Sequence, residues 1–204
     1  MIAADTLGSY GSTKRYKDVQ RIIRINDTCL LGASGEISDF QYIQRLLDGL
    51  ATEDFCMDDG LTMTPQDVYN YLCRVLYNRR NKMDPLWNSL VVGGVGADGK
   101  PFLGCVMMNG TNFTDSHLAT GFGNHLARPL FREFHRPDMS AAEAEELLKK
   151  SLRVCYYRDK QSINKFQIAR VDGDGVQVSE PFALDVTWDY QHFQNPTRLA
   201  PGAW

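Results

Sequence analysis

The chain has 204 residues, of which 43% are hydrophobic and 11% aromatic, a composition typical of one folded globular domain. Its net charge of -3 leaves no basic excess for phosphates, and the densest basic run, Arg79-Arg80-Asn81-Lys82, is short. We therefore expect no nucleic-acid partner. No run approaches the roughly 18 apolar residues of a membrane span, and the first residues lack a secretory signal. We therefore expect no membrane contact and a cytoplasmic and nuclear location.

The cysteines and histidines do not suggest a metal or a disulfide framework. The five cysteines are odd in number, widely spaced and never arranged as C-x-x-C, which predicts reduced, mostly buried thiols. The four histidines do not complete a zinc-ligand spacing with them. We expect neither a metal nor a cofactor.

The first third of the chain predicts strands followed by helices. Short apolar runs at residues 2–4, 19–25 and 28–33 are separated by Gly, Ser and Asn-Asp, which favours an antiparallel meander. From Ser38 onward, apolar residues recur at three- and four-residue spacing and predict a helix. A second helix is predicted to begin at Thr64-Pro65, because Thr64 can cap the free amides with Asp67 three residues later.

Two hairpins and a third helix follow. Runs at residues 90–92 and 102–107 flank a turn that contains Asp98-Gly99, and runs at 165–171 and 176–178 flank Asp172-Gly173-Asp174-Gly175. Ser140 and Glu143 form a capping box at the start of a helix between the two hairpins. This order predicts an α+β fold in one domain, and periodicity alone leaves several α+β architectures open.

One glycine pattern resembles a nucleotide-binding motif and is excluded. Gly94-x-Gly96-x-x-Gly99 matches a dinucleotide fingerprint, but Pro101-Phe102-Leu103 opens a strand after it. A phosphate-binding turn must open a helix whose free amides face the ligand. We interpret this segment as a turn.

Three segments together carry a resemblance to a known family. Ile2-Ala3-Ala4-Asp5-Thr6, Leu31-Gly32-Ala33-Ser34-Gly35 and the late segment from Tyr156 to Ser162 resemble proteasome beta subunits, which are N-terminal nucleophile hydrolases. Leu7-Gly8-Ser9-Tyr10-Gly11-Ser12 and residues 81–88 resemble non-catalytic members in particular. The resemblance implies a four-layer αββα sandwich of two antiparallel sheets, with the first strand missing because it precedes Met1. It implies a domain over residues 1–186 and an extension over 187–204.

The positions that match the family's catalytic machinery are altered. The resemblance places the family's acidic residue at Asp5, its catalytic lysine at Arg21 and its loop serine at Phe122, while Asp159 and Ser162 are kept. A guanidinium stays charged and cannot take part in deprotonating a hydroxyl as a lysine with a depressed pKa can. We therefore predict that Arg21 forms a structural ion pair with Asp5 and that none of these residues is catalytic.

The resemblance thus implies a non-catalytic structural subunit that completes the beta ring in protein degradation, with the other alpha and beta subunits as partners. Two alternatives stay open: an active threonine endopeptidase whose nucleophile lies upstream, and a self-assembling adaptor unrelated to proteolysis. In the family the C-terminal extension clamps the two half-particles, whereas a tail folded on its own domain is the alternative. Large, mostly aromatic side chains are the expected assembly contacts, and they are Trp87, Trp188, Tyr190, His192, Phe193 and Trp204.

Overall fold

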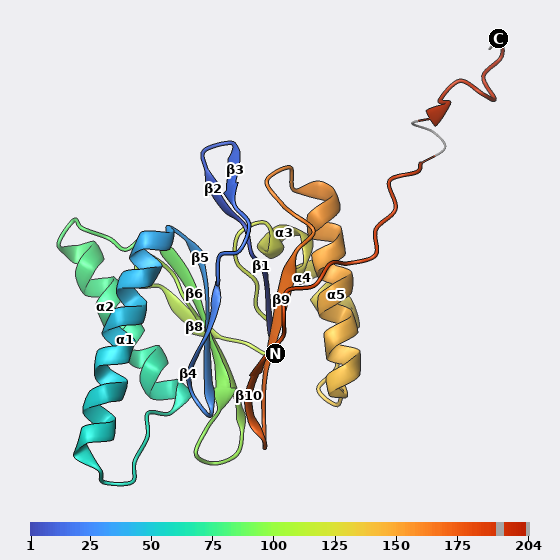
Figure 1. The fold of residues 1–204 in the computed structure, drawn as a ribbon. Coiled ribbons are helices and arrows are strands. Elements are labelled where there is room, and N and C mark those ends of the chain that lie inside the picture. The colour runs from blue at the N-terminus through green and yellow to red at the C-terminus, as the bar shows by residue number, and fades with distance from the viewer. Residues whose placement is uncertain (191–193, 203–204) are drawn as a thin grey trace.

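The computed structural model describes residues 1–190 and 194–202, and Figure 1 shows the arrangement of their helices and strands. His192, Phe193 and Trp204 lie outside the described residues. The elements in chain order are β1 (Ile2–Asp5), β2 (Gly8–Tyr10), β3 (Thr13–Tyr16), β4 (Ile22–Asn26), β5 (Cys29–Gly35), α1 (Ile37–Met57), α2 (Pro65–Asn81), β6 (Asn88–Val95), β7 (Pro101–Val106), β8 (Asn112–Thr114), α3 (Gly123–Leu126), α4 (Arg128–Phe134), α5 (Ala141–Arg158), β9 (Phe166–Asp172) and β10 (Gly175–Val178).

The strands of the described residues form three antiparallel sheets. The largest has the order β4-β5-β6-β7-β8, so each strand pairs with its neighbours in the chain. A second sheet has the order β1-β9-β10, and β2 pairs with β3 in a separate hairpin. The predicted α+β class is confirmed.

The predicted meander of the first three strands is wrong. β1 pairs with β9, with Ile2 opposite Ala169 and Asp5 opposite Phe166, and it is not hydrogen-bonded to β4. The second strand is also shorter than expected, because β4 begins at Ile22. The β2–β3 hairpin, which the sequence analysis missed, lies between the two strands and carries the chain from one sheet to the other.

Apolar side chains hold the sheets and helices together as layers. α1 and α2 cover one face of the five-stranded sheet, and the three-stranded sheet lies on its other face with α5 beyond it (Figure 1). Phe40, Ile43 and Leu47 of α1 pack in one cluster with residues of α2 and the large sheet. Ile22 and Leu30 pack against Ala169 between the two sheets. The cavity described below opens in this inter-sheet region.

The helix starts follow local capping chemistry. The Thr64 hydroxyl accepts the amide of Asp67 while the Asp67 carboxylate accepts the amide of Thr64, as predicted. Ser140 and Glu143 form the same reciprocal pair at the start of α5. The amides left free in a first helical turn are satisfied in this way. α1 begins one residue earlier than expected, at Ile37, because Glu36 caps it.

Both predicted hairpins are present. β6 and β7 flank the turn at Asp98-Gly99, so the glycine-rich segment opens a strand and no helix. β9 and β10 flank the turn at residues 173–174. Within the described residues, no helix combines the length and apolar character that crossing a membrane requires.

Candidate functional site

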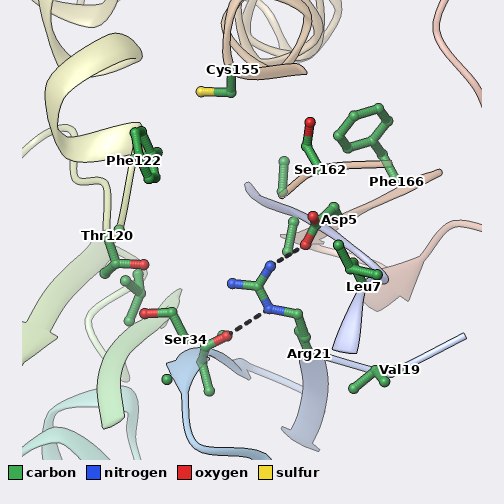
Figure 2. A pocket seen from close by; sticks show the side chains of 18 of the residues that line it. Asp5, Leu7, Val19, Arg21, Ser34, Thr120, Phe122, Cys155, Ser162 and Phe166 are labelled. Atoms are coloured by element: carbon green, nitrogen blue, oxygen red, sulfur yellow. Dashed lines mark hydrogen bonds and ion pairs between the residues drawn. The ribbon is translucent and has the colours of Figure 1, made fainter. Parts of the chain in front are cut away.

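One large pocket brings together all five residues that the sequence analysis placed at the family's catalytic positions. It has a volume of about 1410 Å³ and is lined by β1, the segment before β4, the β2–β3 hairpin, the start of α3 and the end of α5 (Figure 2). Its lining includes the five positions although they are far apart in the chain: Asp5, Arg21, Phe122, Asp159 and Ser162.

Asp5 and Arg21 form an ion pair at the base of this pocket. Arg21 Nη1 donates to Asp5 Oδ1, and Arg21 Nε donates to the carbonyl oxygen of Ala33 at 3.1 Å (Figure 2). The guanidinium is therefore fixed from two sides, by the end of β1 and by β5. Burial raises the pKa of the Asp5 carboxyl, while Arg21 acts in the opposite direction.

Asp159 and Ser162 complete the end of α5. The Ser162 hydroxyl lies 2.5 Å from the carbonyl oxygen of Asp159 and 3.3 Å from that of Tyr156, so it donates to the last carbonyls of the helix. The Asp159 carboxylate accepts the amide of Gln161 at 2.8 Å, which closes the turn toward β9. Both kept side chains are occupied with backbone groups.

Phe122, which the sequence analysis placed at the family's loop serine, points its aromatic ring into the pocket (Figure 2). The residue is 58% exposed and immediately precedes α3. Gly121 before it adopts a positive φ of 60°, a conformation that glycine takes without strain. The ring offers no hydrogen-bond donor or acceptor to a reacting group.

Three further pocket residues carry a hydroxyl or thiol that the sequence analysis did not single out. Ser34 donates to the carbonyl oxygen of Ser89 at 3.4 Å. Burial and the nearby Asp159 and Asp5 raise the pKa of the Cys155 thiol to about 11, so it is not a thiolate at neutral pH. Thr120 lies beside Phe122 (Figure 2). The helical spacing of α5 could have pointed to Cys155, and Ser34 lies in a segment that carries the family resemblance, whereas no sequence signal marked Thr120.

The described side chains that line the pocket do not pair a nucleophile with a base. Among its described residues, no hydroxyl or thiol is hydrogen-bonded to a side chain that could take its proton. Nor do three or more His, Cys, Asp or Glu side chains gather in the described part of the chain as a metal site would require.

Trp87, one of the expected assembly contacts, is exposed beside a buried Leu86, and its contact with a partner stays a prediction. Trp87 is 63% exposed, whereas Leu86 is 1% exposed because it packs in the core between α1, α2 and the large sheet. The Trp87 backbone is fixed: its amide donates to Asp39, and its carbonyl accepts the amide of Glu36. Gly35 lies so close that an added Cβ would come within 2.1 Å of the Trp87 carbonyl oxygen.

The start of the C-terminal extension folds back onto α5. Trp188 packs edge-on against Tyr157 and Tyr156, with ring centroids 5.0 Å and 5.7 Å apart, and the amide of Thr187 donates to the Tyr157 hydroxyl at 2.8 Å. Tyr190, two residues later, is exposed. The predicted contacts at His192, Phe193 and Trp204 lie outside the described residues.

The chain belongs to the proteasome subunit family, because the model of that family matches residues 1–171. It is 52% identical over 204 residues to the proteasome subunit beta type-4 of Arabidopsis thaliana, covering 100% of this chain and 82% of that protein. Identity to the Xenopus laevis beta type-4 subunit is 41% over 194 residues, covering 94% and 80%. Identity to the Drosophila melanogaster beta type-4 subunit is 42% over 193 residues, covering 93% and 72%.

These relatives make the chain a proteasome beta subunit, and they confirm the resemblance on which the sequence analysis relied. Membership in this family implies assembly with other proteasome subunits. The particular similarity is to beta type-4 subunits.

Proposed function

We propose that this beta subunit is non-catalytic and that it serves as a structural member of a proteasome core particle, in the cytoplasm and nucleus. In this role it completes a seven-membered beta ring in a particle of stacked alpha and beta rings that degrades ubiquitin-tagged proteins with the use of ATP. The single observation that carries the proposal is the ion pair between Arg21 and Asp5.

The chemistry of that pair supports inactivity. An N-terminal nucleophile needs neighbouring groups that accept or withdraw its proton. Arg21 stays charged, and two of its donors are already used by Asp5 and the Ala33 carbonyl. Phe122 removes a further hydroxyl, and Ser162 is committed to the end of α5. Each substitution weakens catalysis while leaving the fold intact.

The same proposal covers the finer architecture. We propose that the complete domain is a four-layer αββα sandwich, with a further strand upstream of β1. The layer order of α1 and α2, two antiparallel sheets and α5 supports it (Figure 1). The division into a domain over residues 1–186 and an extension over 187–204 stays a prediction.

The extension is proposed to clamp the two half-particles by reaching into the opposite beta ring. Trp188 supports one part of this role, because its contacts with Tyr156 and Tyr157 anchor the beginning of the extension on its own domain. Aromatic side chains in an extended segment are typical anchors for a partner's groove. Trp188 thus anchors the start of the extension, while its expected contact with a partner subunit stays a prediction, since the residue is 56% exposed.

Native particles treated with a threonine-directed epoxyketone test the proposal. A tagged copy of the full-length subunit is purified with its particle, and each subunit's mass is measured before and after the reaction. We expect the tagged subunit to migrate in a very large particle from both cytosolic and nuclear fractions, without added probe mass, while other beta subunits of that particle react.

Two outcomes would contradict this. Probe on an N-terminal threonine of this subunit would show an active endopeptidase, the first alternative. A small particle that contains only this chain would favour a self-assembling adaptor. The catalytic subunits of the same particle serve as the internal positive control.

A further inference from the structure

We propose that the β2–β3 hairpin, residues 8–16, together with Lys17 is a docking surface for another proteasome subunit. The surface of that partner is acidic and accommodates aromatic side chains. This inference rests on the proposed function, because it assumes that the chain is assembled in a particle. The hairpin projects beyond both larger sheets (Figure 1). It was missed by the sequence analysis and serves no role in the ion pair at the base of the pocket.

The hairpin exposes both of its faces. All four residues of β3 are exposed, and in β2 only Gly8 is buried. A two-stranded ribbon without a buried face is marginally stable in water. Tyr10 is 76% exposed and Tyr16 is 57% exposed. Covering these two rings with a partner would supply the apolar burial that the ribbon lacks.

Two hydrogen bonds nevertheless hold the hairpin in place. Lys14 Nζ donates to the carbonyl oxygen of Ser162 at 2.7 Å. The Gln161 side-chain amide donates to the carbonyl oxygen of Gly11 at 2.9 Å. Both tie the ribbon to the turn after α5. The hairpin is therefore presented in a fixed position, which lowers the entropic cost of binding.

The charge of the hairpin decides the chemistry of the partner. Residues 6–17 contain Lys14, Arg15 and Lys17 and no Asp or Glu. The next carboxylate, Asp18, is paired with Lys165. The Arg15 guanidinium lies over the Tyr16 ring, 5.6 Å from its centroid. Tyrosine and arginine are enriched at the centres of protein interfaces, and an acidic surface complements this charge.

A protein partner is favoured over a phosphate-bearing one. The whole chain is acidic, with a net charge of -3, so the positive region is local. Nucleic-acid binding relies on many phosphate contacts, whereas this ribbon offers only three cations. Family membership already requires contacts with other subunits.

Photo-crosslinking in the native particle tests the inference. The full-length subunit carries p-benzoylphenylalanine in place of Tyr10, and the particle is isolated on a native gel, irradiated and digested for mass spectrometry. We expect a crosslink to a peptide of another subunit in which Asp and Glu outnumber Lys and Arg. The double variant Arg15→Glu/Lys17→Glu should lower its yield about tenfold, because like charges then face each other.

The matched control is Arg74→Glu/Lys82→Glu, which makes the same change of charge at exposed positions of α2 and just after it. We expect it to leave the Tyr10 crosslink unchanged. A crosslink only within the chain, to a basic peptide, to nucleic acid or to lipid would overturn the inference while leaving the proposed function standing. Absence of the subunit from any large particle would overturn the proposed function, and this inference with it.

Discussion

The carboxyl of Asp5 has a raised pKa although it is ion-paired with the guanidinium of Arg21. Burial is the largest cause, and the nearby Asp159 acts in the same direction, while Arg21 and the amide of Leu7 lower the pKa. The cost of removing the carboxylate from water is therefore not fully offset by its partner.

We expect the variant Asp5→Asn to gain stability relative to the parent chain as the pH rises. The folded parent holds the Asp5 proton more tightly than the unfolded chain does, because the Asp5 pKa is near 3.8 in the unfolded chain and raised in the fold. Ionisation therefore costs the parent stability as the pH rises from that value through the folded pKa, and asparagine has no proton to lose. Urea unfolding of both full-length chains from about pH 3 to about pH 7 measures this difference. A trend in favour of the parent would show that Arg21 outweighs burial.

Arg21→Lys should destabilise the chain by about 1–3 kcal/mol, because an ammonium cannot reproduce the two-point hold on Asp5 and the Ala33 carbonyl. The matched control is Arg24→Lys at the exposed ion pair with Asp27, for which we expect less than about 0.5 kcal/mol. The free energy of unfolding in urea is the measurement. Equal losses at the two sites would mean that the fork geometry of Arg21 contributes nothing.

Trp188→Ala should release the beginning of the C-terminal extension. Its ring contacts with Tyr156 and Tyr157 disappear, and the hydrogen bond from the Thr187 amide to Tyr157 then opens more often. We expect amide hydrogen exchange at Thr187 to become at least about tenfold faster. Trp87→Ala, at another exposed tryptophan, is the control and should leave this exchange unchanged. Unaltered exchange in the Trp188 variant would rule out the anchor.

The five free cysteines should differ strongly in reactivity. Cys56 is exposed, whereas burial raises the pKa of Cys29 to about 12 and that of Cys155 to about 11. At about pH 7.5 we expect maleimide to modify Cys56 at least about 100-fold faster than Cys29 or Cys155. Mass spectrometry of timed samples resolves the sites, and urea-unfolded chain is the control in which all should react. Rapid labelling of Cys155 would mean that its thiol is ionised in the pocket.

The helices were predictable because their signals are local. The two capping boxes each need only residues three positions apart, and both are present as expected. The short helices α3 and α4 were missed, because four and seven residues do not establish a periodic pattern. The prediction of mostly buried thiols holds fully only for Cys29 and Cys105, since Cys73 and Cys155 are half-buried and Cys56 is exposed.

Long-range pairing was not predictable from the pattern. The sequence of β1 predicts the first strand of a meander, yet its partner β9 begins at Phe166. Alternation along a strand reveals that it pairs but not with which strand. Leu86 shows a related limit: adjacent apolar residues in a loop carry no period, so the sequence could not tell that Leu86 points inward and Trp87 outward.

The site was predictable only through the family resemblance. Asp5, Arg21, Phe122, Asp159 and Ser162 have no mutual spacing that would place them together, and the structure gathers them at one pocket. Two hydrogen bonds join the hairpin to the α5–β9 turn, one from Lys14 to the turn and one from Gln161 to the hairpin. No sequence signal indicated them, because each joins groups about 150 residues apart.

The pairing of β1 with β9 sets an order for folding during synthesis. The five-stranded sheet with α1 and α2 is built from residues 22–114, and each strand finds its partner among residues already made. β1 is translated before the strands of this sheet, yet it cannot pair with β9 until residues 166–169 have left the ribosome. Contacts between distant parts of a chain form slowly. The nascent chain therefore carries β1 without its strand partner until β9 has emerged, the stage at which a chaperone would shield it.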